Sequence, residues 1–310
     1  MTTDSPLVSI TILSYNRKES LRQTLNKVIH QDYKNIEIIV VDNFSSDGSP
    51  EMIKHDFPFV KIIQLDQNIG AVAFNKGFNS ARGKYILVLD DDSYPLNETI
   101  NKGINVFSTN PKIGIVSYEI YNTLSNKSET DNFVQKGLSF IGCGVLISKE
   151  VLDKLNGYCE LYFMFHNELD FAIRTLKEGY QIKYLSGAKI IHDQKAILNR
   201  EGKSNSLISE FRYYNYFVSY SIFLIKNFSF RNYSLVLLKW FLNRFIICFK
   251  YPYFKVYVKA IIKIFSNLNM FLNDKEEIPL EIQKLYFNMI PFIDRDYFPN
   301  FSKPSFKLFR

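Results

Sequence analysis

Apolar segments alternate with helical segments along residues 1–200. Runs rich in Val, Ile and Leu predict buried strands at 7–14, 37–41, 60–65 and 85–89. Leu21, Leu25 and Val28 recur at helical spacing between the first two runs, and 71–81 has helical composition before Gly83. This alternation predicts an α/β domain whose mostly parallel central sheet has helices on both faces.

Polar side chains follow three of these strands at the point where each strand ends. The first run ends in Ser14-Tyr15-Asn16-Arg17, the second in Asp42-Asn43, and the fourth in Asp90-Asp91-Asp92. The carboxyl ends of parallel strands meet at one edge of a sheet, and ligands bind there. The sequence therefore predicts one polar ligand site at this edge.

The second part of the chain predicts further elements and a change of character. We expect an apolar, glycine-containing strand at 138–147, a helix at 167–177 and a short strand at 189–192. After about residue 203 the chain becomes basic and aromatic. We therefore expect a catalytic domain at 1–203, with halves 1–95 and 96–203, and a mainly helical C-terminal region at 204–310.

The excess positive charge of the chain lies in its last third. The net charge is +7, yet residues 1–200 hold 22 basic and 23 acidic side chains, against 16 and 8 in 201–310. Such asymmetry indicates an anionic partner for the C-terminal region, either a membrane surface or a nucleic acid. Its charges flank long apolar runs rather than a polar groove, which disfavours nucleic acid.

Two interpretations of the C-terminal region stay open. Lys255, Lys259 and Lys263 recur at helical spacing among large apolar residues, a pattern typical of a helix lying in an anionic membrane interface. The longest uncharged stretch, 213–225, has 13 residues, whereas a membrane-spanning helix needs about 20. The other interpretation is a helical subdomain that covers the catalytic domain or forms a homodimer.

Cysteine usage favours a cytoplasmic setting. Cys143, Cys159 and Cys248 are odd in number and widely spaced, which fits neither a disulfide framework nor a cysteine zinc site. The N-terminus is polar, and the apolar run at 7–13 is short and lacks a basic flank. We therefore expect no signal peptide.

The acidic residues at two strand ends suggest specific chemistry. Three adjacent carboxylates repel one another, and a hard divalent cation such as Mg²⁺ removes that cost. The alternative for Asp90-Asp91-Asp92 is a solvated acidic turn before Pro95. Asp42 can accept the ring N–H of uracil or thymine, or a ribose hydroxyl, and its alternative role is to cap the turn that follows.

Four motifs together resemble family 2 glycosyltransferases of the GT-A fold, including enzymes of bacterial cell-surface polysaccharides such as rhamnosyltransferases. Their order and spacing match across residues 1–200. They are Val8 to Arg17, Ile39 to Gly48, Asn68-Ile69-Gly70 continuing to Asn75-Lys76-Gly77, and Gly83 to Asp92.

The resemblance implies a nucleotide-sugar donor and an inverting transfer. A pyrimidine nucleotide, UDP or dTDP, suits Asp42. Asp90 and Asp92 form the DxD element that holds Mn²⁺ or Mg²⁺, with Asp92 as the foremost ligand. His192 can approach the metal or the diphosphate, or is simply a polar strand end. The residues implied in nucleotide-sugar binding are Ser14, Tyr15, Asn16, Arg17, Asp42, Asn68, Gly70, Asn75, Asp90 and Asp91.

The acceptor half continues the resemblance. Gly142 to Ser148 is similar to the strand before the acceptor site, and Phe163 to Phe171 matches an acidic pair followed by a further aspartate, with Asn167 in the first acidic place. Glu168 takes the place of the catalytic base, which would deprotonate a hydroxyl of a glycan or lipid-linked glycan. Asp170 is the further aspartate. Both acids can instead be stabilising charges at a helix start, with Asp170 paired to Arg174.

Two other classes of function are considered. A dinucleotide oxidoreductase needs Gly-x-Gly-x-x-Gly after the first strand, where this chain has Ser-Tyr-Asn-Arg, so we discard it. Asn167 motivates the second class, a degenerate transferase that keeps the fold and acts as a partner or membrane-associated subunit.

Overall fold

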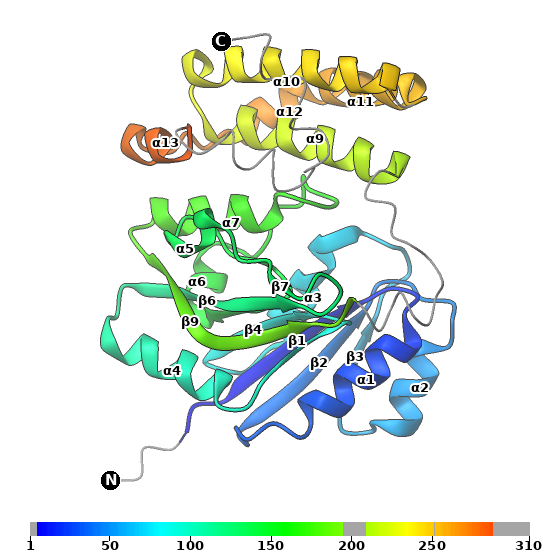
Figure 1. Cartoon of the computed structure of the whole chain (residues 1–310), viewed down its shortest axis with the longest axis vertical. Helices are drawn as coiled ribbons and strands as arrows, with labels where there is room; N and C mark the ends of the chain where they lie inside the picture. Colours follow the sequence, from blue (N-terminus) through cyan, green and yellow to red (C-terminus); the bar gives the residue numbers. More distant parts are fainter. Residues whose placement is uncertain (1–4, 195–208, 251, 288–310) are drawn as a thin grey trace. The chain divides into compact units, whose positions relative to one another are not determined.

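The computed structural model describes residues 5–194, 209–250 and 252–287 (Figure 1). The chain divides into two compact units. The first unit comprises 1–159 and 171–204, and the second comprises 160–170 and 205–310. The expected boundary at 203/204 lies outside the described residues.

The first unit is built on a nine-stranded sheet of order β3-β2-β1-β4-β8-β6-β9-β5, with β7 paired to β6. The strands are β1 (Val8–Ser14), β2 (Ile36–Asp42), β3 (Lys61–Gln64), β4 (Tyr85–Asp90), β5 (Ser93–Pro95), β6 (Ile113–Asn122), β7 (Lys127–Ser128), β8 (Val145–Ser148) and β9 (Gln181–His192).

The expected parallel sheet forms the N-terminal half. β1 pairs in parallel with β2 and with β4, and β2 pairs in parallel with β3. The register aligns Ser14 with Asp42 and Leu13 with Asp90. The polar residues at the ends of β1, β2 and β4 therefore lie at one edge of the sheet, as predicted.

The other half of the sheet is mixed. β8 is antiparallel to β4 and β6, β9 is parallel to β6, and β5 is antiparallel to β9. The strand predicted at 138–147 begins only at Val145, because the backbone turns just before it, with Gly144 N–H donating to the Ile141 carbonyl. The strand predicted at 189–192 is longer and starts at Gln181.

Helices cover both faces of the sheet, which is why its central strands are apolar throughout. On β4, Leu87 and Leu89 pack in the core with α1 (Lys18–Val28), α2 (Ser49–Asp56) and α4 (Thr99–Thr109). Ile86 and Val88 face the other core, which holds α3 (Phe74–Ser80), α6 (Lys149–Lys154) and part of α7 (Asn167–Lys177). Two short helices, η1 (Gly70–Ala73) and α5 (Asn132–Gln135), complete this unit.

The second unit is helical, as expected for the C-terminal region. It contains α9 (Glu210–Asn227), α10 (Phe230–Lys250), α11 (Phe254–Ser266), α12 (Leu268–Asn273) and α13 (Leu280–Phe287) (Figure 1). Aromatic rings fill its core, and the Trp240 ring lies 4.7 Å from that of Tyr220 and 3.9 Å from the Arg244 guanidinium. Among the described residues, none of the helices is long and apolar enough to span a membrane.

Segment 160–170 belongs to this helical unit. The His166 ring packs against Tyr216 and Tyr220 of α9 at centroid distances of 5.0 and 5.2 Å. Ser219 Oγ donates to the Met164 carbonyl over 2.7 Å. The segment that carries Glu168 and Asp170 is therefore positioned by α9.

Candidate active site

Hydrogen bonds join the loops that follow the first three strands. Asn16 N–H donates to Ser45 Oγ over 2.9 Å, and Asn16 Oδ1 accepts from Ser46 N–H over 2.7 Å. Asn43 Nδ2 donates to Asn68 Oδ1 and to the Gly70 carbonyl, over 3.0 and 3.2 Å. Asn16 has φ of +52° and Gly70 has φ of +72°, left-handed conformations that asparagine and glycine adopt at low cost. These bonds give the edge a fixed backbone.

Asp91 is buried and held from several sides. Ser14 Oγ donates to Asp91 Oδ2 over 3.0 Å, and Arg17 Nη1 lies 3.1 Å from Asp91 Oδ1. The hydroxyls of Ser20 and Thr24 on α1 donate to the Asp91 backbone carbonyl. Burial raises the pKa of Asp91 to about 7, against the opposing charge of Arg17. Asp91 therefore links β1, α1 and the end of β4.

Asp92 lies between two cationic side chains. Arg17 Nη1 is 3.0 Å from Asp92 Oδ2, and His192 Nε2 is 3.4 Å from Asp92 Oδ1. Burial would raise the pKa of Asp92, but the contacts with His192 and Arg17 hold it below its usual value. Burial disfavours the charge of Arg17, yet Asp91 and then Asp92 raise the pKa of its guanidinium.

The pairing of β5 with β9 brings His192 to the aspartates. Ser93 is the register partner of His192, and Asp193 N–H donates to the Asp92 carbonyl over 2.7 Å. His192 Nδ1 lies 2.9 Å from Glu129 Oε2. Burial opposes a charge on His192, but the hydrogen bonds to Asp92 and Glu129 raise its pKa to about 11. The site therefore favours positive charge at this place.

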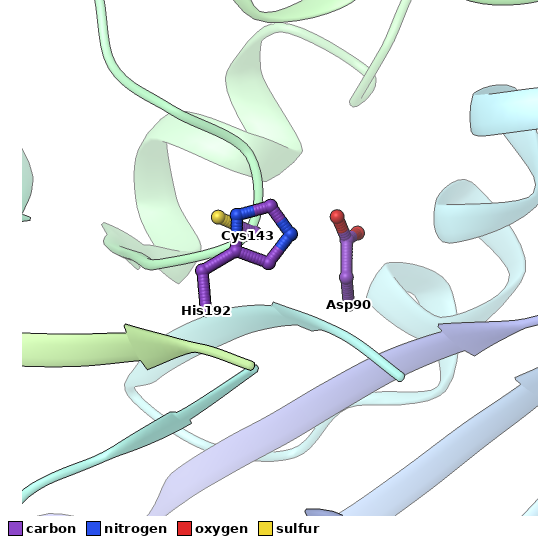
Figure 2. A group of neighbouring side chains, drawn as sticks. All are labelled: Asp90, Cys143 and His192. Carbon is purple, nitrogen blue, oxygen red and sulfur yellow. The ribbon is translucent and has the colours of Figure 1, made fainter. Parts of the chain in front are cut away.

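Asp90 belongs to a second group of side chains at the same edge. It is half-buried, and one ligand atom from each of Asp90, Cys143 and His192 lies within 4.8 Å of the other two. Figure 2 shows the His192 ring with the other two side chains beside it. Sequence reasoning missed Cys143 and Glu129 as site residues, because neither has a local ligand-spacing pattern.

Asp42 and Asn75 differ in how their polar atoms are used. Asp42 is buried, and its Oδ2 accepts from Ser45 N–H over 3.1 Å, while its Oδ1 has no hydrogen-bond partner within the described part of the chain. The amide of Asn75 bonds both ways to the backbone of Tyr158, each over 2.8 Å. One carboxylate oxygen of Asp42 is thus available as an acceptor, whereas the amide of Asn75 is used to fix the backbone at Tyr158.

Tyr15, next to Ser14, is exposed.

The predicted catalytic acids lie in the first turn of α7, within the helical unit. Glu168 is half-buried, and burial raises the pKa of its carboxyl. Asp170 is fully buried, and its Oδ1 lies 3.1 Å from Tyr162 Oη, 3.2 Å from Asn227 Nδ2 and 3.5 Å from Lys226 Nζ. The expected partner Arg174 donates to the carbonyls of Leu155 and Gly157.

Comparison with known proteins places the chain in a family. The sequence model of "Glycosyl transferase family 2" matches residues 9–171. The poly-beta-1,6-N-acetyl-D-glucosamine synthase of Staphylococcus epidermidis is 33% identical over 144 residues, which cover 44% of this chain and only 34% of that protein. An Escherichia coli protein, the UDP-Glc:alpha-D-GlcNAc-diphosphoundecaprenol beta-1,3-glucosyltransferase WfaP, is 30% identical over 54% of this chain and 68% of its own length.

Solved structures show the same fold. A mannosyltransferase from Pyrobaculum calidifontis, solved with GDP-Man and Mn²⁺, matches with a TM-score of 0.54 and 20% identity over 72% of this chain and 63% of that one. Staphylococcus aureus TarS matches with a TM-score of 0.54 and 16% identity over 76% and 43%. The chain therefore has the GT-A fold and belongs to glycosyl transferase family 2.

Proposed function

We propose that this protein is an inverting glycosyltransferase that uses a UDP- or dTDP-linked sugar. The observation that carries this proposal is the buried Oδ1 of Asp42, which has no hydrogen-bond partner within the described residues. Asp42 ends β2 at the same sheet edge as the acidic residues that end β4, with β1 between the two strands. An acceptor there fits the ring N–H of a pyrimidine. A buried acceptor left without a donor costs about 1–3 kcal/mol, which a bound base would recover.

The donor side of the site is then built from the strand ends. Ser14, Tyr15, Asn16 and Asp42 would hold the nucleoside, and Asn68 and Gly70 would line the cleft through the loop that Asn43 fixes. Arg17 and Asp91 would position the acidic residues that follow β4. They form an ion pair with each other, Arg17 also pairs with Asp92, and Asp91 accepts a hydrogen bond from Ser14. Asn75 would act through the backbone of Tyr158.

Asp90, Asp92 and His192 would hold a divalent cation, Mn²⁺ or Mg²⁺. The fit is supported by the position of the three side chains. Asp92 Oδ1 lies 3.4 Å from His192 Nε2, and a ligand atom of Asp90 lies within 4.8 Å of one of His192. Two structural neighbours were solved with Mn²⁺, and one of them, GalNAc-T7, also holds UDP. Such an ion stabilises the negative charge of the departing diphosphate.

Glu168 would act as the general base. It would take the proton from an acceptor hydroxyl as that oxygen bonds to the anomeric carbon, while the bond from this carbon to the nucleoside diphosphate breaks. A raised pKa suits this task, because a base is most effective when its pKa is near the working pH. Asp170 would serve as a positioning residue, because its contacts with Lys226 and Asn227 anchor the turn that carries Glu168.

A degenerate transferase acting as a partner subunit is the alternative. Its basis is Asn167, which is fully buried and donates from Nδ2 to the Tyr162 carbonyl over 3.1 Å. That hydrogen bond gives Asn167 a structural role in segment 160–170. The neighbouring Glu168 is still available as an acidic side chain. Release of free sugar or transferred product from a UDP-sugar by the purified protein would exclude the alternative, and a donor panel without turnover would support it.

We further propose that the helical unit binds the cytoplasmic surface of an anionic membrane, where a lipid-linked glycan acceptor would be reached. The name of WfaP describes a diphosphoundecaprenol-linked acceptor for that relative. Lys255, Lys259 and Lys263 are exposed on α11. Large apolar side chains are also exposed on α11 and on the preceding helix, α10. They are Leu235, Leu238, Leu242, Phe245, Ile246, Phe249, Phe254, Val258, Ile262 and Phe265.

Flotation with lipid vesicles tests the membrane proposal. The protein should float with vesicles rich in phosphatidylglycerol more than with neutral phosphatidylcholine vesicles, and salt should weaken this binding. Replacing the three lysines of α11 by glutamine should reduce flotation. Equal behaviour with both lipids would contradict the proposal, and a stable dimer in sedimentation would instead assign this face to a second copy.

A further inference from the structure

We propose that Asp90, Cys143 and His192 form a mixed oxygen, sulfur and nitrogen site that prefers a thiophilic divalent ion, Zn²⁺ or Co²⁺, over Mg²⁺. The inference deepens the cation site of the proposed function and rests on it. The three ligand atoms lie within 4.8 Å of one another and come from three distant parts of the sequence (Figure 2).

The sheet itself brings Cys143 to Asp90. β4 and β8 are antiparallel, with Val88 opposite Val145. Asp90 ends β4, and Cys143 lies in the turn just before β8, so both residues lie at the same end of this strand pair. Cys143 is buried, and the residue after it is Gly144, where an added Cβ would lie 2.5 Å from Ile120 Cδ1 and 2.8 Å from Ile190 Cγ1. Close packing at Gly144 therefore fixes the turn that presents the thiol.

His192 has the surroundings of a metal-binding histidine. Its Nδ1 lies 2.9 Å from Glu129 Oε2, an arrangement in which a carboxylate orients the ring and leaves Nε2 for the metal. His192 Nε2 lies 3.4 Å from Asp92 Oδ1 and 3.3 Å from Gln194 Nε2. A cation bound at Nε2 would take the place of the proton that this nitrogen shares with Asp92.

The donor set decides which ion is favoured. Thiolate and imidazole are preferred ligands of Zn²⁺ and Co²⁺, whereas Mg²⁺ takes oxygen ligands and keeps several waters. A tetrahedral zinc shell has edges of about 3.4–3.8 Å, so side-chain shifts of roughly 1 Å would close the site. A site of Asp90 and Asp92 alone would lack this selectivity. Cys143 is therefore inferred to be the residue that determines it.

Spectroscopy of the full chain with Co²⁺ tests the inference without relying on turnover. Wild-type protein should show a thiolate-to-cobalt charge-transfer band in the near ultraviolet. Cys143→Ser should lose the band, while Cys159→Ser, a half-buried cysteine outside the cluster, should retain it. In competition titrations, Cys143→Ser should weaken Zn²⁺ binding by about 10–100-fold and leave Mg²⁺ binding within about 2-fold.

Three results would overturn the inference. They are cobalt bound without the band, no cobalt bound, or unchanged Zn²⁺ affinity in Cys143→Ser. If this variant does not fold, X-ray absorption of the zinc-loaded wild type decides, since a shell of nitrogen and oxygen alone would exclude Cys143. Nucleotide titrations separate this inference from the proposed function. Metal-dependent UDP binding without metal–sulfur bonding leaves only the function, and sulfur bonding without nucleotide binding leaves only this site.

Discussion

Lys226 Nζ lies 3.5 Å from Asp170 Oδ1, and both side chains are almost completely buried. Tyr162 and Asn227 donate to the same carboxylate oxygen. The ion pair joins segment 160–170 to the end of α9, and it holds the turn that carries Glu168. A buried pair of this kind contributes little compared with an apolar pair, but breaking it is costly.

Removing one partner of this pair should destabilise the helical unit strongly. Asp170→Asn and Lys226→Met should each lower the free energy of unfolding by roughly 3–5 kcal/mol, because each leaves the other charge buried and uncompensated. The double variant should be more stable than the sum of the two losses predicts, by about 2 kcal/mol. Urea denaturation measures all three.

A surface ion pair provides the matched control. The side chains of Lys102 and Glu98 lie 2.9 Å apart and are exposed at the start of α4, and Glu98→Gln should cost at most about 0.5 kcal/mol. Additive losses in the buried pair, or losses as small as that of the control, would show that Asp170 does not anchor the segment.

Glu168→Gln should remove the general base while leaving donor binding intact. We expect kcat to fall by about 10²–10⁴-fold, with the Kd for UDP or dTDP changed by less than about 2-fold. Glu168→Asp should keep part of the activity. Glu160→Gln, an exposed glutamate of the same segment, is the control and should behave as wild type. Unchanged kcat in Glu168→Gln would transfer the role of base to another group.

Asp42→Ala should weaken pyrimidine nucleotide binding. Loss of a charged acceptor corresponds to about 1.5–3 kcal/mol, so the Kd for UDP should rise by about 10–100-fold by calorimetry. Asp66→Ala, an exposed aspartate just after β3, should have no effect. A folded Asp42→Ala protein with wild-type affinity would show that the carboxylate does not contact the base.

His166 should make the stability of the protein depend on pH. Burial lowers the pKa of its imidazole to about 3, whereas the unfolded chain takes up the proton near pH 6.5. The unfolded state therefore binds more protons between these values. The contribution of His166 to the free energy of unfolding is therefore complete above pH 6.5 and is lost as the pH falls toward 3.

Urea denaturation at pH 7.5 and 5.0 measures this dependence. His166 should account for about 2 kcal/mol of the loss between these values. His166→Asn tolerates the left-handed φ of +62° and should flatten the pH profile, even though lost ring packing lowers stability at both values. His55→Asn, at an exposed histidine, should leave the slope unchanged. An equally steep profile in His166→Asn would contradict the assignment.

The donor edge could be predicted from sequence because its residues follow the ends of parallel strands. β1 pairs with β2 and β4 in a register that aligns Ser14 with Asp42, and Leu13 with Asp90. The burial of both faces of these strands favours that register. The helical character of the C-terminal region was equally accessible, since its apolar and basic residues recur with helical spacing.

The second half of the sheet was harder to predict. β6, which occupies the centre of the mixed half, was missed, and the strand predicted at 138–147 was too long. Local apolar composition cannot show that the chain turns at Ile141–Gly144 before pairing antiparallel to β4. The grouping of Cys143, Glu129 and His192 depends on that long-range pairing. Asp170 was ambiguous for the same reason, since its partner Lys226 is 56 residues away.

Calorimetric titration with nucleotides tests whether the edge formed by β1, β2 and β4 is a metal-dependent donor site. UDP, dTDP and GDP are titrated into wild-type protein with and without Mn²⁺ or Mg²⁺, and into Asp92→Ala and Asp90→Ala. The wild-type protein should bind a pyrimidine nucleotide only when metal is present, and both variants should lose this binding. A folded wild-type protein that binds none of the three nucleotides in the presence of either metal would contradict this prediction.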